Sequence, residues 1–209
     1  MRKQGGRACA GSIPGHTLGA SALGRCFFIV APTLSTDRLT LRGHTAEDFE
    51  ASLRLWNRPE VYRHISGKPC PRETGWGRIQ RYAGQWALGL PGFWVVEETA
   101  TGDYVGEMGF GHFWRDIDPP TAGALEAGWV MDPAFFGRGY AHEAMRAAFG
   151  WLADARPPEP VLALIAPENA PSLALAARLG FAASHEAVYH DAPTRVLVRG
   201  VQHWRAGLS

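Results

Sequence analysis

The stretch EAGWVMDPAFFGRGYAHEAM, from Glu126 to Met145, passes from a strand pattern through a glycine-containing turn into a helix pattern. Apolar residues from Tyr140 onward recur at i, i+1, i+4 and i+5, which predicts an amphipathic helix. Gly137 and Gly139 stand where that helix begins. The first four N–H groups of a helix have no internal partner, and their partial positive charge suits an anion. The turn by itself is equally typical of a tight structural turn and of an anion site.

Three better-known glycine or histidine motifs do not fit this stretch. A dinucleotide fingerprint requires a third glycine where His142 stands, and an acid at the tip of the next strand. A P-loop requires Gly-Lys-Ser or Gly-Lys-Thr, which the chain lacks here. The His142-Glu143 pair is not followed by a second histidine, because Arg146 occupies that position, so a zinc motif of this kind is excluded.

Working outward from this stretch, the patterns predict alternating strands and helices along one domain. Strands are expected at 38–42, 92–98, 104–113, 122–131 and 161–166, with a terminal hairpin between 182 and 204. Helices are expected at about 46–57, 72–88, from 140 onward, and after Asn169. Thr45 and Asp48 form a variant of the capping box for the first helix. The three middle strands are expected to form an antiparallel meander, and the helix after Gly139 a parallel βαβ crossover.

The bulk composition is that of an ordinary globular protein. The 209 residues carry a net charge of +1, are 46% hydrophobic and are 20% charged, so no overall field favours nucleic acid or a membrane as partner. The three cysteines form no CxxC pair, which favours a reducing cytoplasmic setting. No run of about 18 apolar residues predicts a membrane span.

The first 34 residues differ from the rest in composition. They are rich in Gly, Ala and Ser and contain no acid. We expect residues 1–34 to form a disordered extension and residues 35–205 a single domain. A transit peptide and a start codon placed too far upstream are the alternatives for this segment.

Four segments in this order resemble the Gcn5-related N-acetyltransferase (GNAT) superfamily, and more closely its ribosomal-protein N-terminal acetyltransferase (RimJ/RimL) branch. They are STDRLTLR, FWVVEETATGDYVGEMGF, EAGWVMDPAFFGRGYAHEAM and NAPSLALAARLGF. The resemblance covers roughly Ser35 to Trp204. It implies an α/β (α+β) fold with a mixed, mostly antiparallel sheet of about seven strands flanked by about four helices.

The resemblance implies acetyl-CoA as co-substrate, bound where the strand before the turn and the strand after the helix diverge. The pantetheine arm is then expected along the backbone of Trp129, Val130 and Met131. The diphosphate is expected on the N–H groups of Phe136, Gly137, Arg138, Gly139, Tyr140 and Ala141. Members of the family often carry Gln or Arg three residues before the first glycine, where this chain has Ala134. No metal is expected.

The resemblance also implies two catalytic residues. Glu126 is expected to deprotonate the amine through water, or else to be a structural acid paired with an arginine, and Glu107 is a weaker alternative base. Many relatives carry an acidic tyrosine seven residues after the asparagine, but that position is Ala176 here. The RimJ/RimL branch instead has a serine three residues after it, which is Ser172; its hydroxyl is expected to serve the leaving thiolate, or else to bond the helix backbone.

Asn169 is expected to be either a cap or a pantetheine contact, and Tyr140 to pack rather than to act as an acid. An N–H near Val130 is expected to polarise the thioester carbonyl. The resemblance implies a primary amine as acceptor, on a small molecule or a protein N-terminus, and we expect a monomer or homodimer. The tryptophans at 56, 76, 86, 94 and 114 either fill the core or line an apolar acceptor pocket. A non-catalytic acyl-CoA sensor on the same fold is the alternative function.

Overall fold

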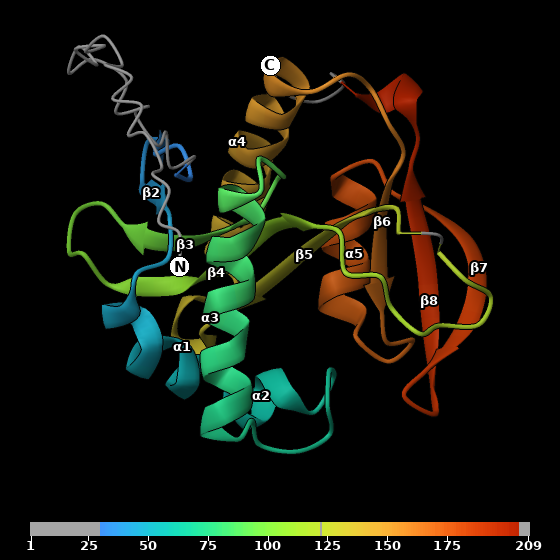
Figure 1. The fold of residues 1–209 in the computed structure, drawn as a ribbon, viewed down its shortest axis with the longest axis horizontal. Helices are drawn as coiled ribbons and strands as arrows, with labels where there is room; N and C mark the ends of the chain where they lie inside the picture. Colours follow the sequence, from blue (N-terminus) through green and yellow to red (C-terminus); the bar gives the residue numbers. More distant parts are fainter. Residues whose placement is uncertain (1–29, 122, 205–209) are drawn as a thin grey trace, which may run out of the picture.

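The computed structural model describes residues 30–121 and 123–204, which form one eight-stranded sheet with helices on both faces (Figure 1). The strands lie in the order β1-β2-β3-β4-β5-β6-β8-β7. The strands are β1 (Leu34–Ser35), β2 (Leu39–Arg42), β3 (Phe93–Glu98), β4 (Tyr104–Gly111), β5 (Leu125–Met131), β6 (Val161–Ile165), β7 (Ala182–Tyr189) and β8 (Ala192–Arg199). The helices are α1 (Phe49–Trp56), α2 (Pro59–Tyr62), α3 (Arg72–Ala87), α4 (Tyr140–Ala155) and α5 (Ala170–Arg178).

The strand pairing confirms the mixed sheet, the β3-β4-β5 meander and the crossover through α4. Every neighbouring pair is antiparallel except β5 and β6, which are parallel. The eighth strand, beyond the seven expected, is the two-residue β1, and the fifth helix is the single turn α2. Figure 1 shows the β7–β8 hairpin at one edge of the sheet with α5 beside β6, and α1 to α3 toward the other half.

The two faces of β4 and β5 have different roles. Side chains of a strand alternate between faces, and Met108, Phe110, Leu125 and Ala127 pack in the main core with apolar residues of α4. The alternate positions point to the side of α1 and α2, where Val130 packs against Leu55, Trp56 and Val61. Glu107 and Glu126 lie on this second face by the same alternation.

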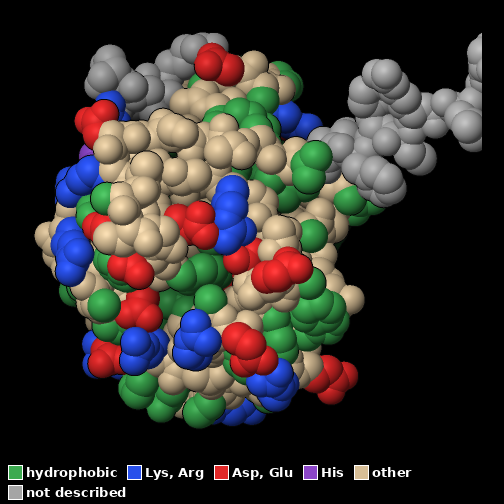
Figure 2. All heavy atoms as spheres, turned by 90° about the vertical axis from the view of Figure 1, so that its left-hand side faces the viewer, with side chains coloured by type: hydrophobic (Ala, Val, Ile, Leu, Met, Phe, Trp, Pro, Cys, Tyr) green, Lys and Arg blue, Asp and Glu red, His purple; other side chains and the backbone are tan. Residues whose placement is uncertain are grey.

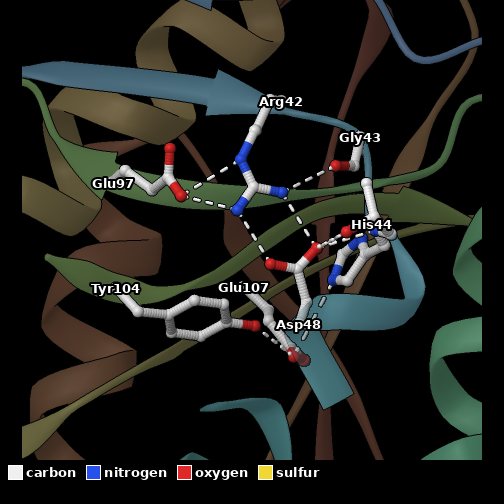
Figure 3. A network of polar contacts seen from close by, with 8 residues as sticks. Arg42, Gly43, His44, Asp48, Glu97, Tyr104 and Glu107 are labelled. Atoms are coloured by element: carbon white, nitrogen blue, oxygen red, sulfur yellow. Dashed lines mark hydrogen bonds and ion pairs between the residues drawn. The ribbon is translucent and has the colours of Figure 1, made fainter. Parts of the chain in front are cut away.

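An arginine network attaches the start of the helical segment to the sheet (Figure 3). Arg42 on β2 makes a two-pronged bond to Asp48, at 2.9 and 2.8 Å, and also bonds Glu97 on β3. Asp48 in turn accepts the backbone N–H of Thr45 at 2.7 Å, in the expected capping box. Burial raises the pKa of Asp48, but these partners outweigh burial and hold that pKa below its usual value.

Figure 2 shows the side of the molecule that lies on the left in Figure 1. On this face, acidic and basic side chains are interspersed, and neither sign forms a separate patch. Among the described residues, no helix has both the length and the apolar character that a membrane span requires. The expected extension of residues 1–34 falls mostly on residues outside the described part. Pro32 is described, and its carbonyl accepts the indole N–H of Trp94 at 2.8 Å.

Candidate active site

The parallel pair β5 and β6 separates partway along its length. Their register contains only Leu125 opposite Val161 and Glu126 opposite Leu162, although β5 continues to Met131 and β6 to Ile165. Beyond Glu126, the edge of β5 that faces β6 therefore has backbone groups free of sheet pairing. An extended chain can add to such an edge through main-chain hydrogen bonds. This is the segment, Trp129 to Met131, at which the pantetheine arm is expected.

The glycine turn lies at the open end of this separation and has the geometry of an anion cradle. Gly137 and Gly139 have φ of +76° and +80°, in the left-handed region that other L-residues adopt only with strain. A Cβ at Gly137 would meet no atom within 4 Å. Within the described chain, the N–H groups of residues 137–142 donate to no carbonyl. The N–H of Phe136, which was expected among the diphosphate donors, is instead used in the preceding turn, where it donates to the Pro133 carbonyl at 3.1 Å. The turn therefore fits a diphosphate through its backbone.

Tyr140 begins α4 and is fixed by packing, as the sequence predicts. It is buried, and its ring stacks on that of Phe135 with ring centroids 6.1 Å apart. Its hydroxyl donates to the carboxylate of Glu98 on β3. Hydrogen bonding to Glu98 and burial raise the pKa of Tyr140. Its side chain therefore supports the turn, and only its backbone N–H is available to a ligand there.

Glu126 lies at the last paired position of β5, where the two strands part. It is 3% exposed, and its Oε2 accepts a 2.7 Å bond from Nε of Arg115. Burial raises its pKa, and Arg115 and His112 oppose that rise only in part. Its other oxygen, Oε1, accepts no hydrogen bond from the described residues. Glu126 therefore has features of both expected roles. It is paired with an arginine, as a structural acid would be, and its pKa is raised, as a general base requires.

Glu107 is a different kind of buried acid. It is fully buried, and it accepts a 2.7 Å bond from the indole of Trp56. It also accepts a 2.7 Å bond from the hydroxyl of Tyr104, and Nε2 of His44 lies 3.8 Å away (Figure 3). Burial raises its pKa, but His44, Ser52 and Trp56 outweigh burial and lower it to about 2. A carboxylate this weakly basic and this enclosed is unsuited to take a proton from an amine, so Glu107 is a structural acid.

Ser172 and Trp129 meet across the gap between the strands. Ser172 stands in the first turn of α5, and its Oγ accepts the indole N–H of Trp129 at 3.3 Å. Asn169 caps the same helix, because its side chain accepts the N–H of Ser172 at 3.2 Å. The structure therefore gives Asn169 the cap role. It also gives the Ser172 hydroxyl a side-chain partner on β5.

An aromatic layer covers the second face of the sheet beside Glu126. Tyr82 of α3 stacks on Phe93 with ring centroids 4.3 Å apart, and Phe113 meets Phe93 edge-on at 6.0 Å. Phe93 lies across β5 because residue 128 is glycine, where a Cβ would come within 2.8 Å of the ring. Arg115 lies over Phe113 and bonds the Tyr189 hydroxyl at 2.9 Å.

Three of the five tryptophans have the expected core role. Trp86 and Trp94 are buried in the main core, and Trp56 is buried against Glu107. Trp76 and Trp114 are exposed, and Trp114, at 76%, is the most accessible of the five. Neither of these two is buried in the core, and their role as lining of an acceptor pocket stays a prediction.

Arg115 is the main site residue that the sequence patterns miss. It lies in the long β4–β5 loop, where neither periodicity nor a motif marks it. Within the described part of the chain, no group of three or more His, Cys, Asp or Glu side chains is arranged to hold a metal ion.

Comparisons with known proteins place this geometry in one family. Residues 38–182 match the acetyltransferase (GNAT) domain family. The uncharacterized protein YkkB of Bacillus subtilis is 31% identical over 153 residues, which are 70% of this chain and 83% of YkkB. The uncharacterized N-acetyltransferase p20 of Bacillus licheniformis is 27% identical over 150 residues, 71% of this chain and 82% of p20.

Solved structures agree. An acetyltransferase from Agrobacterium tumefaciens, 28% identical, superposes with a TM-score of 0.69 over 80% of this chain and 94% of its own. A RimL ribosomal L7/L12 alpha-N-protein acetyltransferase in complex with coenzyme A is 14% identical, with a TM-score of 0.65 over 80% and 97% of the two chains, and shows the shared fold. The chain belongs to the GNAT acetyltransferase family, and it is an acyl-CoA-dependent acetyltransferase.

Proposed function

We propose that the protein transfers an acetyl group from acetyl-CoA to a primary amine by direct attack in a ternary complex. The observation that carries the proposal is the separation of β5 from β6 at Glu126, with the glycine turn at its open end. An unpaired strand edge, a glycine turn with free N–H groups and a carboxylate of raised pKa on β5 and the segment that follows it support this proposal. Holding an amine and a thioester together there supplies much of the rate, because both groups are already reactive.

We propose Glu126 as the general base. An amine attacks only when neutral, so a proton must leave the ammonium form, directly or through a water molecule. The raised pKa of Glu126 moves it toward the working pH of such a base. Arg115 keeps the carboxylate oriented through Oε2, which leaves Oε1 to accept the proton.

We propose Ser172 as the hydrogen-bond donor to the departing thiolate. An indole N–H can only donate, so the Ser172 oxygen acts as acceptor toward Trp129. The serine O–H is then available to donate elsewhere. As the amine nitrogen bonds the acetyl carbon and the C–S bond breaks, this hydroxyl donates a hydrogen bond to the negative sulfur, and an N–H near Val130 would polarise the carbonyl oxygen. The extra proton on the attacking nitrogen then passes through solvent to the thiolate, which leaves as the CoA thiol.

The acceptor is proposed to be a primary amine of a small molecule or of a protein N-terminus, the class to which the RimJ/RimL resemblance points. The aromatic layer of Tyr82, Phe93 and Phe113 beside Glu126 supports an acceptor with an apolar or aromatic part. Either kind of acceptor would enter over the second face of the sheet, from the side of α3.

The test is a panel of amines and N-terminal peptides assayed by release of the CoA thiol. We expect at least one amine to raise turnover, and Glu126→Gln to lower kcat by about 10²- to 10⁴-fold, the usual contribution of a general base. If coenzyme A binds but no amine raises turnover, the protein is a non-catalytic acyl-CoA-binding module instead. If coenzyme A does not bind, the site itself is wrongly placed.

A further inference from the structure

Arg38, which precedes β2, reaches the backbone of the glycine turn one hundred residues later in the chain. Its Nη1 donates to the carbonyl oxygen of Arg138 at 3.1 Å, and its guanidinium lies 4.5 Å from the ring centroid of Tyr140. The Arg138 carbonyl and the Gly139 N–H belong to one planar trans peptide, so they point in opposite directions. By holding the carbonyl on one side, Arg38 fixes the Gly139 N–H toward the other.

Glu143, in the first turn of α4, holds Arg38 in this position. Its Oε2 accepts from Nε and Nη2 of Arg38 at 2.8 and 2.5 Å. Its Oε1 accepts from the Arg38 backbone N–H at 3.1 Å and from the Thr36 hydroxyl at 2.6 Å. Four hydrogen bonds thus attach the chain before β2 to the first turn of the helix.

The charge of Glu143 is unfavourable for an anion bound at this helix start. A carboxylate there repels a diphosphate, which the helix N-terminus would otherwise attract. Arg38 bonds both carboxylate oxygens of Glu143, so the net charge of the pair is close to zero. Its effect on the bound anion is therefore expected to come from geometry rather than from charge. Side-chain exposure is 46% for Arg38 and 20% for Glu143, so the pair is partly screened by solvent.

We propose that Arg38 and Glu143 are positioning residues that fix the Gly139 N–H for the diphosphate of the acyl-CoA. This inference rests on the proposed function, because it takes the glycine turn as the diphosphate site. The pair acts through the Arg138–Gly139 peptide rather than by touching the diphosphate. Its contribution is an oriented donor in the turn before the ligand arrives.

The sharpest test is Glu143→Gln, because charge and positioning predict opposite results. Removing a negative charge beside a diphosphate should tighten coenzyme A binding if only long-range electrostatics matters. If Glu143 holds Arg38, binding should instead weaken by about three- to tenfold, the equivalent of one net hydrogen bond. Isothermal titration of the full-length protein with coenzyme A measures this. Glu73→Gln, an acid in the first turn of α3, is the matched control and should leave the affinity unchanged.

A second set of variants separates positioning from direct contact. Arg38→Lys keeps the charge but cannot bond Glu143 and the Arg138 carbonyl together through a planar fork. We expect Arg38→Lys and Arg38→Met to weaken coenzyme A binding by similar factors. We expect each variant to weaken binding of dephospho-coenzyme A, which keeps the diphosphate, by the same factor. S-acetylpantetheine, which has no diphosphate, should be used as acyl donor with unchanged kcat/KM by both variants.

The outcomes are separable from the proposed function. If the unaltered protein fails to bind coenzyme A, the proposed function fails. If it binds and Glu143→Gln binds as tightly or more tightly, the positioning role is refuted while the function stands. An equal loss with S-acetylpantetheine would also refute it, since that result means general disruption of the fold. Full affinity in Arg38→Lys would show a direct charge contact in place of positioning.

Discussion

Replacing Arg115 by Met tests how Glu126 is held at the point where β5 and β6 part. The change removes the 2.7 Å ion pair to Glu126 and the 2.9 Å bond to Tyr189, while a flexible apolar side chain still covers Phe113. Glu126 is then buried without an ion-pair partner bonded to it. We expect a loss of stability and a change in the pH dependence of both stability and activity.

The expected size follows from burial and distance. Two unit charges about 4 Å apart attract by about 4 kcal/mol at an effective dielectric constant of about 20. Breaking a fully buried pair typically costs about 3–5 kcal/mol. The Arg115 side chain remains 27% exposed, against 4% for Glu126, so solvent screens part of this energy. We expect a loss of about 2–3 kcal/mol, which lowers Tm by about 5–10 °C in a domain of this size.

The pH dependence has a definite sign. Burial raises the pKa of Glu126 and Arg115 lowers it, so removing Arg115 raises that pKa further. A carboxyl whose pKa is raised on folding favours the folded state at low pH, and this contribution is lost as pH rises through the raised pKa. The stability deficit of Arg115→Met should therefore shrink as pH falls toward the ordinary glutamate range. The acidic limb of kcat/KM should move to higher pH.

These effects are measured by thermal unfolding of the unaltered protein and of Arg115→Met across pH 5 to 8, together with a pH-rate profile of each. Arg115→Met/Glu126→Gln is the control, because an amide does not titrate and the pH-dependent part of the deficit should vanish. A deficit of the same size at every pH, with an unmoved acidic limb, would refute the electrostatic argument and leave Arg115 a packing residue.

Three further predictions concern the turn, the serine and the buried acid. Gly139→Asp should weaken coenzyme A binding at least about tenfold, since it sets a carboxylate against the diphosphate, while Gly150→Ala within α4 should not; unchanged affinity in titration would contradict the anion site. Ser172→Ala should lower kcat more than it raises KM for acetyl-CoA in steady-state kinetics, and the reverse pattern would make Ser172 a binding residue only. Glu107, with its pKa lowered to about 2 from 4.5, should contribute stability above pH 4.5 that is lost as pH falls toward 2; Glu107→Gln should remove this part of the acid transition followed by circular dichroism, and an unchanged transition would contradict the assigned pKa.

The elements and the conformation of the glycine turn were predictable because they rest on local patterns. Tyr140 and the apolar residues after it have helical spacing, and the two glycines before them adopt the left-handed conformation that only glycine takes easily. The capping box of Thr45 and Asp48 spans three residues and appears as expected. Each of these features depends on residues within one turn or one strand, so the residue pattern of that short segment predicts it.

The polar pairs that support the site were not predictable, since their partners are distant in the chain. Arg38 and Glu143 are separated by 105 residues, and Arg115 and Tyr189 by 74. Neither residue of such a pair carries a local signal, because an exposed arginine before a strand or in a loop is the ordinary case. These contacts follow from which strands become neighbours, and they became visible only with the fold.

The contrast between Glu107 and Glu126 shows why environment rather than residue type sets the basicity of a carboxylate. Both are glutamates on neighbouring strands, both are buried, and both point to the same face of the sheet. Glu107 receives donors at both oxygens, and its pKa falls to about 2. Glu126 has one partner on one oxygen, so burial prevails and its pKa rises. A carboxylate that its neighbours satisfy completely has no capacity left for a proton, whereas one satisfied by half can accept it.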